Sequence, residues 1–280
     1  MKILIIALFL LKSTLGICQF DFYDMGSPNS YNQQHKEITK HSIKSTQIES
    51  YMESKNIGNG TTYYDTLGRM TCYDNSDSTK KIYYSGVFYY DSFLLKPKKM
   101  VGVHLILGGK YEVTFNSVYK KGLLISDSSD KSMCKVYYDY DTLGRDIKEL
   151  SVFNNSDRKR TILKGYTNNK IAWVKDYFRK NGQEFLDSHK IFYYDKDSLL
   201  IKVEELISNN DNTSNTNRGN REYFYNSKGL LSKMEESALV NEYEYNDKGL
   251  IIKSSFYFKD NFSTVKNKYN SVTYYTYSFY

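Results

Sequence analysis

Cysteine and histidine are scarce in this chain, and their scarcity removes several classes of site. The 280 residues include three cysteines and four histidines. Cys72 and Cys134 lie far apart, and neither belongs to a Cys-x-x-Cys pair or a Cys/His cluster, so zinc and thioredoxin-like sites have no support. The histidines are scattered and do not supply three or four converging metal ligands: His35, His41, His104 and His189. The sequence therefore predicts no metal and no cofactor.

Long apolar runs are also missing, apart from one short run at the N-terminus. Lys2 precedes the apolar run 3–11, and the small residues Ser13 and Gly16 follow it, a pattern typical of a secretory signal peptide. The run is too short to span a membrane, and no other stretch approaches about 18 apolar residues. We predict a signal peptide over residues 1–18, no transmembrane segment, and a protein that is secreted or lies in the periplasm or cell envelope.

Export leaves alternatives open for the cysteines. A lipoprotein anchored through Cys18 is less favoured, because the residue before a lipidated cysteine should be small and here it is Ile17. After removal of a signal peptide, Cys72 and Cys134 remain. In an oxidising compartment they form either a disulfide or two unpaired cysteines within strands.

Neither the charge nor the motifs point to nucleic acid or to a common class of enzyme. The formal net charge is +7, and the lysines are scattered among acids rather than gathered in a stripe, so nucleic-acid binding is not expected. The chain lacks a Gly-x-Ser-x-Gly elbow and a phosphate-binding glycine-rich loop. The adjacent acids Glu204-Glu205 and Glu235-Glu236 would point to opposite faces of a strand. We predict no catalytic residues and favour a non-enzymatic protein.

Tyrosine, in contrast, is abundant. The chain has 29 tyrosines and 15 phenylalanines but only two prolines. Tyrosine is favoured in strands, where its ring packs and its hydroxyl reaches water. In the segment 241–245, Tyr alternates with Glu, which places aromatic rings on one sheet face and carboxylates on the other. The composition therefore indicates a large sheet surface covered by half-exposed aromatic side chains.

A short unit recurs along the chain: Tyr, then Asp or Asn, two variable positions, and Gly or once Ser. Recurrence of this kind indicates a repeat architecture and explains the repeated residues as parts of a scaffold. The clear copies are Tyr64-Asp65-Thr66-Leu67-Gly68-Arg69, Tyr140-Asp141-Thr142-Leu143-Gly144-Arg145, Tyr194-Asp195-Lys196-Asp197-Ser198-Leu199, Tyr225-Asn226-Ser227-Lys228-Gly229-Leu230 and Tyr245-Asn246-Asp247-Lys248-Gly249-Leu250. Weaker copies lie at 90–95, 119–124, 166–171 and 178–182.

Each copy has the chemistry of a hairpin turn. Asp or Asn at the first turn position can accept a hydrogen bond from a backbone N–H two residues later. Gly at the fourth position adopts a positive φ at little cost. The combination favours a type I turn that closes into a left-handed residue, which is a common hairpin connection.

The pattern predicts an all-β fold, an antiparallel β-meander of repeated hairpins with roughly twelve to sixteen strands. The sheet is either open and extended or curled into a barrel. We expect polar loops, the longest at 208–220, and at most one short N-terminal helix, over 47–55 after Thr46. The predicted organisation is a signal peptide (1–18), a polar leader (19–45) and one β-sheet domain (46–280).

Tyr-Asp-Thr-Leu-Gly-Arg at 64–69 and 140–145 resembles the YD repeat of Rhs-type bacterial proteins, whose core is Tyr-Asp-x-x-Gly-Arg-Leu. The later Asn-x-Lys-Gly-Leu copies resemble a degenerate form found in small secreted envelope proteins. The resemblance extends loosely over residues 61–280. Large members of that family build extended β-sheet shells that enclose a toxin or bind carbohydrate. This chain is much shorter, and no recognisable toxin or protease domain follows its repeats.

Three functions from different classes remain. The favoured one is an exported scaffold or binding module for a protein or glycan partner, because exposed aromatics stack on sugars and anchor partners. The candidate binding residues are Trp173, Tyr223, Tyr225, Tyr243 and Tyr245. The second is an envelope glycan hydrolase that uses paired carboxylates, although Asp65, Asp141 and Asp195 are already explained as turn formers. The third, implied by the Rhs resemblance, is a toxin carrier or neutralising protein.

Overall fold

The computed structural model describes residues 38–52, 55–77, 79, 82–90, 97–104, 109–130, 132, 134–154, 156–208, 215–259 and 271–280. Apart from one helical turn at residues 38–40, the regular structure is β. The strands are β1 (Ile43–Met52), β2 (Lys55–Tyr64), β3 (Met70–Ser76), β4 (Ile82–Tyr89), β5 (Lys99–His104), β6 (Gly109–Thr114), β7 (Val118–Lys120), β8 (Leu123–Asp127), β9 (Cys134–Tyr140), β10 (Asp146–Phe153), β11 (Lys159–Thr167), β12 (Lys170–Lys180), β13 (Gln183–Tyr194), β14 (Leu200–Ser208), β15 (Asn215–Tyr225), β16 (Leu231–Glu235), β17 (Leu239–Tyr245), β18 (Ile251–Phe258) and β19 (Ser271–Phe279).

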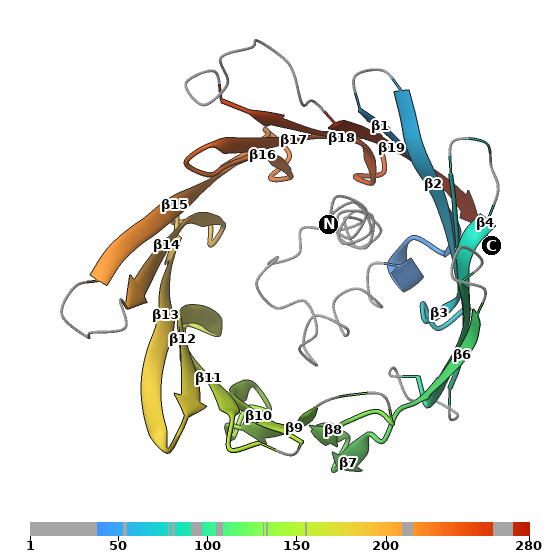
Figure 1. Cartoon of the computed structure of the whole chain (residues 1–280). Coiled ribbons are helices and arrows are strands. Elements are labelled where there is room, and N and C mark those ends of the chain that lie inside the picture. The colour runs from blue at the N-terminus through green and yellow to red at the C-terminus, as the bar shows by residue number, and fades with distance from the viewer. Residues whose placement is uncertain are drawn as a thin grey trace. The chain divides into compact units, whose positions relative to one another are not determined.

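These strands belong to one antiparallel sheet of 19 strands. The predicted all-β meander is therefore confirmed, while the predicted number of strands was too low. Strands that follow one another in the chain pair with one another, for example β2 with β3 and β11 with β12. The exception is β1, which pairs with both β2 and the last strand β19. Figure 1 shows β17, β18, β19, β1 and β2 side by side.

The chain divides into two compact units. Among the described residues, unit 1 takes those of 38–113, 225–233 and 238–280, and unit 2 takes those of 114–224 and 234–237. The two units bury different kinds of side chain. The buried polar residues of unit 1 are serines and threonines, whereas the buried charged residues all lie in unit 2 and are Asp146, Lys164 and Asp176.

Unit 1 has two apolar clusters that lie on one face of its strands. The first consists of Ile38, Ile43, Tyr64 and Leu250, with Met70 and Tyr277 packed against it. The second consists of Ile48, Ile251 and Tyr275, with Tyr243, Tyr245 and Tyr277 at its edge. Each of the buried members is at most 6% exposed. The hydrophobic effect on this one face holds β1, β2, β18 and β19 together.

Two glycines lie directly beneath aromatic rings of a neighbouring strand. Gly165 pairs with Trp173, and a Cβ at this glycine would lie 2.1 Å from the indole Cε2. Gly86 pairs with Tyr73 in the same way, at 2.5 Å from the ring. The absence of a side chain lets the ring pack against the backbone of the next strand. This packing offsets part of the loss of strand stability that glycine causes.

The helix predicted over 47–55 is wrong. Residues up to Met52 form β1, in which Ile48 and Ser50 are buried and Gln47 and Glu49 are exposed. This two-residue alternation is the pattern of a strand with one buried face. The partners that stabilise β1 as a strand come from both ends of the chain, since β1 pairs with β2 and with β19.

The long loop predicted at 208–220 is shorter than expected. Ser208 ends β14, and β15 already begins at Asn215. Residues 215–217 and 219–222 pair with β14, and the register shifts between Glu205 and Leu206. The polar sequence shows no apolar alternation from which a strand could be predicted. The strand forms through backbone N–H and C=O groups, which do not depend on the side chains.

Several predictions concern residues outside the described ones. The signal peptide, the Cys18 alternative, His35 and most of the polar leader fall there. Residues 38–45 of the predicted leader are described, and Ile38 and Ile43 pack in the first apolar cluster. The boundaries of the three predicted segments stay a prediction. Within the described part, no helix is long and apolar enough to cross a membrane.

The two described cysteines are free thiols. Of the two alternatives that the sequence leaves open, the structure therefore has unpaired cysteines. Cys72 is on β3, where partial burial and the nearby Asp74 carboxylate raise the pKa of its thiol. A raised pKa keeps the thiol protonated and makes it a poor nucleophile.

Candidate functional site

The repeated turns have the geometry that the sequence predicts. In each of the five clear copies, the N–H of the fourth turn residue donates to the carbonyl of the Asp or Asn, at 2.9–3.0 Å. The Asp or Asn N–H in turn donates to the carbonyl four residues later, at 2.9 Å. The fourth residue has a φ between 71° and 80° in every copy. It is glycine in four copies, and only Ser198 adopts this φ with a side chain.

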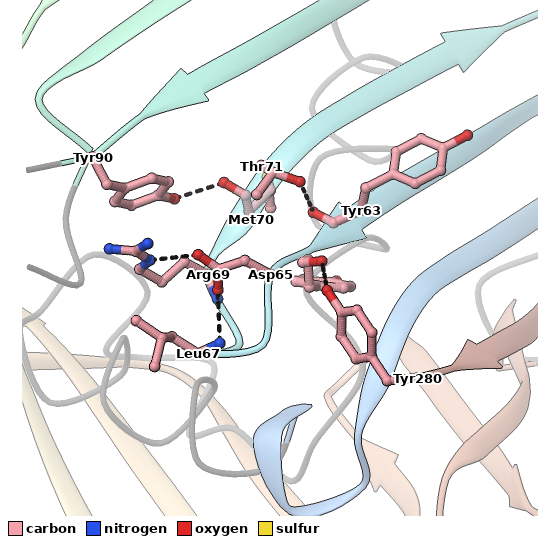
Figure 2. Close-up of polar contacts among 9 residues, drawn as sticks. Tyr63, Asp65, Leu67, Arg69, Met70, Thr71, Tyr90 and Tyr280 are labelled. Carbon is pink, nitrogen blue, oxygen red and sulfur yellow. Dashed lines mark hydrogen bonds and ion pairs between the residues drawn. The ribbon is translucent and has the colours of Figure 1, made fainter. Parts of the chain in front are cut away.

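Figure 2 shows how the Asp side chain closes the first turn. Oδ1 of Asp65 accepts hydrogen bonds from the backbone N–H of Leu67 and of Arg69, both at 2.9 Å. The other oxygen, Oδ2, accepts from Nε of Arg69 at 2.7 Å. Asp141 and Arg145 repeat this arrangement, with Nε to Oδ2 at 2.6 Å. The carboxylates of Asp65 and Asp141 are therefore hydrogen-bonded to the backbone and the arginine of their own turns.

The pKa of Asp141 reflects the same hydrogen bonds within the turn. Hydrogen bonds from the backbone N–H of Arg145, from the Arg145 side chain and from the N–H of Leu143 hold the pKa of this carboxyl below its usual value. A general acid needs a raised pKa instead. This turn position is therefore unsuited to glycan hydrolysis by proton donation.

Tyrosine hydroxyls tie neighbouring strands together beside the turns. A tyrosine near the end of one strand donates its hydroxyl to a carbonyl at the start of the preceding strand, at 2.7–3.0 Å. We call this contact a tyrosine clasp. The donor and acceptor pairs are Tyr90–Met70, Tyr140–Leu124, Tyr166–Asp146, Tyr194–Ile171, Tyr245–Leu231 and Tyr277–Ile251. These hydroxyls therefore satisfy backbone carbonyls of a neighbouring strand.

Cationic side chains of the turns lie over clasp rings. The guanidinium carbon of Arg69 lies 4.6 Å from the centre of the Tyr90 ring, and that of Arg145 lies 4.6 Å from the centre of the Tyr166 ring. Each arginine therefore joins its own Asp to the tyrosine of a later strand. The Asp and Arg of one copy are thus linked, through an ion pair and a cation–π contact, to a tyrosine outside that copy.

A buried charge cluster lies in unit 2, next to the second clear turn. Nζ of Lys164 lies 2.6 Å from Oδ2 of Asp146 and 2.8 Å from Oε1 of Glu149. The side chains of Lys164 and Asp146 are 4% and 0% exposed. The Tyr166 hydroxyl donates to the Asp146 carbonyl at 3.0 Å and lies 3.3 Å from its Oδ1. Burial, reinforced by Asp146 and Glu149, raises the pKa of Tyr140 to about 12, so this phenol stays a neutral donor.

Other strand pairs of unit 2 also carry ion pairs. Arg160 of β11 binds Asp176 of β12 through Nε at 3.0 Å to both carboxylate oxygens, and this contact raises the pKa of the guanidinium. Two further pairs follow on the later strands of the unit: Lys190–Glu205 and Arg221–Glu236. In each pair, opposite charges face one another across neighbouring segments of the sheet.

The opposite face of unit 1 carries exposed rings among charged groups. We use opposite face for the side of β17, β18, β19 and β1 that does not carry the apolar clusters. Tyr274 is 47% exposed, and its Cα partners are Lys253 and Glu49. The ring of Tyr51 meets Tyr274 edge-on at 5.8 Å, and the Tyr51 hydroxyl donates to Oε2 of Glu49 at 3.0 Å. Next to them, Lys253 binds Oε1 of Glu244 at 2.6 Å.

The structure separates the five predicted binding residues. Trp173 lies half-buried on Gly165, with Nζ of Lys175 at 5.4 Å from its ring. Tyr223 is only 7% exposed, so its ring is not part of an open surface. Tyr243 and Tyr245 pack against the second apolar cluster, and the hydroxyl of Tyr245 also forms a tyrosine clasp with the carbonyl of Leu231. Tyr225 is half-buried. Binding through these residues stays a prediction, and sequence reasoning missed Tyr274 because alternation alone does not say which face is buried.

The described residues offer no cluster of metal ligands, and the cavity beside the first turn is small. Among them, no three His, Cys, Asp or Glu side chains converge as metal ligands. Burial and the nearby Lys175 lower the pKa of His189. A cavity of about 190 Å³ lies beside the first turn and is lined in part by Ile38, Asp65 and Tyr280. It is smaller than the roughly 300–1,000 Å³ of ordinary small-molecule sites.

Comparison with known proteins gives weak similarities of fold. No protein-family model matches the chain, and no curated protein sequence matches it. A porin-like protein from Bacteroides uniformis is 12% identical, with a TM-score of 0.47 over 85% of this chain and 97% of that protein. A porin-like protein from Bacteroides vulgatus is 8% identical, with a TM-score of 0.43 over 84% of this chain and 98% of that protein.

A third similar structure contains the toxin-complex components TcdB2 and TccC3. It is 12% identical, with a TM-score of 0.33, and the match covers 73% of this chain but only 15% of that one. At TM-scores below 0.5, these similarities do not place the chain in either group. The resemblance to Rhs-type YD repeats has no support from a family model and stays a prediction.

Proposed function

We propose that this protein is a non-enzymatic binding module of the cell envelope that holds a protein or glycan partner against the opposite face of unit 1. The observation that carries the proposal is the surroundings of Tyr274. Tyr274 is exposed, and its Cα partners on the two neighbouring strands are the charged residues Glu49 and Lys253. An aromatic ring offers stacking area, and the flanking groups accept and donate hydrogen bonds.

The tyrosine clasps support a scaffold beneath this face. Tyr277 binds the carbonyl of Ile251 on the apolar side of β18 and β19, and Tyr245 binds that of Leu231. The first contact ties β19, which carries Tyr274, to β18, which carries Lys253, and the second ties β17 to β16. A rigid sheet presents its side chains without a cost of ordering them on binding.

The proposal is tested with the mature protein on a glycan array and in a pull-down from envelope extract. We expect Tyr274→Ala to lower the affinity for the captured partner by about tenfold or more, which corresponds to about 1.4 kcal/mol. The matched control is Tyr63→Ala, since Tyr63 is 39% exposed but has Ser45 and Cys72 as Cα partners. Blank results in both screens, or equal losses in both variants, would count against the proposal.

A hydrolase is the less supported alternative. It requires two carboxylates in a cleft, one of them with a raised pKa. Asp65 and Asp141 are each bonded to the backbone and the arginine of their own turn. Release of reducing sugar from envelope polysaccharide by the purified protein would revive this alternative. A role beside a secreted toxin rests on the Rhs resemblance alone.

A further inference from the structure

The buried ion pair of unit 2 holds an amine and a carboxyl group at hydrogen-bond distance. Nζ of Lys164, on β11, lies 2.6 Å from Oδ2 of Asp146, the first residue of β10. The two side chains are 4% and 0% exposed, so both are shielded from bulk water. An amine and a carboxylic acid that lose one water become an amide. The pair therefore has the composition and the contact from which a side-chain amide bond can form.

Burial favours the uncharged forms that this reaction needs. An ammonium group has no lone pair for attack, and a carboxylate is a poor electrophile, so a hydrated ion pair does not condense. Removing two charges from water carries a large desolvation cost, which the uncharged forms avoid. Transfer of one proton along the bond from Nζ of Lys164 to Oδ2 of Asp146 gives the neutral amine and the neutral acid. The lone pair of Nζ can then attack Cγ of Asp146, the carbon that carries Oδ2.

A second carboxylate lies where the reaction needs a proton carrier. Oε1 of Glu149 lies 2.8 Å from Nζ of Lys164. A group that takes a proton from the nucleophile and returns it to the leaving group must lie within hydrogen-bond reach of the nucleophile. The Glu149 side chain is 18% exposed, so it connects the cluster to solvent, whereas Asp146 is fully buried. This difference assigns Asp146 as the electrophile and Glu149 as the carrier.

The Tyr166 hydroxyl lies beside the other oxygen of the same carboxyl group. It donates to the backbone carbonyl of Asp146 at 3.0 Å and lies 3.3 Å from Oδ1 of that residue. When Nζ adds to Cγ, negative charge develops on Oδ1. A hydrogen-bond donor held next to such an oxygen stabilises the intermediate. The clasp of Tyr166 thus also places a donor at the reacting carboxyl group.

We propose that Lys164 and Asp146 condense in the folded chain to an amide bond between their side chains, with Glu149 as the proton carrier. The bond from Nζ to Cγ forms, and the bond from Cγ to Oδ2 breaks. Of the three hydrogens of the ammonium group, one stays on the amide nitrogen and two leave with Oδ2 as water. Glu149 takes up one proton and gives it back, so the reaction needs no oxidant, reductant or cofactor.

An exposed pair at the same distance shows what burial adds. Nζ of Lys253 also lies 2.6 Å from Oε1 of Glu244, but these side chains are 30% and 59% exposed. Water keeps both groups of that pair charged, so no amide forms there. The amide of Lys164 and Asp146 joins β10 to β11 across 18 positions of the chain. Like other cross-links, it limits the freedom of the unfolded chain.

Peptide mass spectrometry of the folded mature chain tests the proposal. Trypsin does not cleave after a lysine whose amine is part of an amide bond, so the link should join the tryptic segments 146–148 and 161–170. We expect this linked peptide to be lighter by one water than its two parts, and the intact chain to be lighter by one water. Cleavage after Lys164, or a link to the peptide that begins at Glu149, would overturn the proposal.

Asp146→Asn tests the electrophile by changing the leaving group. Attack of Nζ on the amide carbon releases ammonia in place of water, and the product is the same linked chain as in the wild type. The two proteins should therefore reach the same mass, although their unlinked chains differ. A variant that keeps its side-chain amide and shows no linked peptide would contradict attack at Cγ of residue 146.

Two further variants test the carrier and the nucleophile. Glu149→Gln keeps the shape of the side chain but does not carry the proton, so after refolding from denaturant the link should form about a hundredfold more slowly. Glu244→Gln, at the exposed pair, is the control and should not change the rate. Lys164→Arg keeps the positive charge but should form no link, because a guanidinium stays protonated. Wild-type rates in Glu149→Gln, or loss of water in Lys164→Arg, would contradict these roles.

Discussion

The guanidinium of Arg145 lies 4.6 Å from the centre of the Tyr166 ring while its Nε donates to Asp141 at 2.6 Å. One side chain thus joins the turn between β9 and β10 to the end of β11. Its Nη1 also donates to Oδ1 of Asn169 at 3.0 Å, in the turn that follows. The repeat is therefore more than a row of independent hairpins, because the turns of the first two copies contact residues that come later in the chain.

Removing this connection should weaken unit 2. We expect Arg145→Ala to lower the free energy of unfolding by about 1 kcal/mol, mainly through the lost contact with the Tyr166 ring. Urea unfolding followed by fluorescence measures it, since the sole tryptophan, Trp173, lies in the same unit. Lys148→Ala is the control, because its ion pair with Asp139 is exposed and should contribute little. Equal effects in the two variants would contradict the role of Arg145.

A neighbouring pair of tyrosines tests the clasp. The hydroxyl of Tyr194 donates to the carbonyl of Ile171 in a part-buried bond, whereas that of Tyr193 donates to the Glu204 carboxylate in an exposed bond. We expect Tyr194→Phe to lower the free energy of unfolding by about 1–2 kcal/mol, because a partly buried carbonyl loses its donor. Tyr193→Phe should stay within about 0.5 kcal/mol of the wild type. A clasp that contributes nothing would give the same urea midpoint for both variants.

The turns could be predicted from the sequence because their causes are local. Asp65 and Gly68 are three residues apart, and the bonds that fix the turn lie within the same short segment. The clasps could not be predicted in this way. Their donor and acceptor are separated by 14 residues for Tyr245 and by 26 for Tyr277, since the connections between the strands differ in length.

Pairing between distant segments explains the other errors. The helix expected within β1 is wrong because the partner strand β19 lies at the other end of the chain, with Ser45 and Ser278 in contact across 233 positions. The candidate site was missed for a related reason. Tyr243 and Tyr274 look alike in the sequence, but the apolar clusters cover only one face, and Tyr243 lies on that face.

Gly165 should tolerate no side chain. A Cβ at this position would lie 2.1 Å from Cε2 and 2.2 Å from Nε1 of Trp173, so Gly165→Ala must displace the indole. We expect a loss of about 1–3 kcal/mol, as in other overpacked sites, and a shift of the tryptophan emission. Gly109→Ala is the control, because a Cβ added there would have nothing within 4 Å and the φ of Gly109 is not positive. Unchanged emission of Gly165→Ala would mean that the ring does not lie on the glycine.

The turn carboxylate of Asp141 should make stability depend on pH. Its pKa is lowered in the folded chain, chiefly by the backbone N–H of Arg145 and by the arginine side chain. A lowered pKa contributes stability above the unfolded value, near 3.9, and this contribution is lost as the pH falls through the folded value. Asp141→Asn keeps an acceptor for the backbone but lacks the charge. The variant should be less stable at pH 7, and its difference from the wild type should shrink as the pH falls below the unfolded value, as thermal unfolding would show.

Ser198 offers a stabilising substitution. It is the only one of the five clear copies in which a residue with a Cβ adopts the left-handed conformation at the fourth position, with a φ of 71°. That conformation costs a residue with a side chain roughly 1–2 kcal/mol, and the greater freedom of glycine in the unfolded chain offsets part of the gain. We expect Ser198→Gly to raise the free energy of unfolding by about 0.5–1 kcal/mol.

The reverse substitution and a neighbouring turn residue complete this test. Gly144 holds the same position with a φ of 77°, so Gly144→Ser should lower the stability by a similar amount. Ser227→Gly, inside another copy, changes a residue that is not among those with a positive φ and should gain nothing. The backbone bond from the N–H of residue 198 to the carbonyl of Asp195 is kept in the variant, so only the local conformation changes. A stability of Ser198→Gly equal to or below that of the wild type would show that the serine bears no strain at this turn.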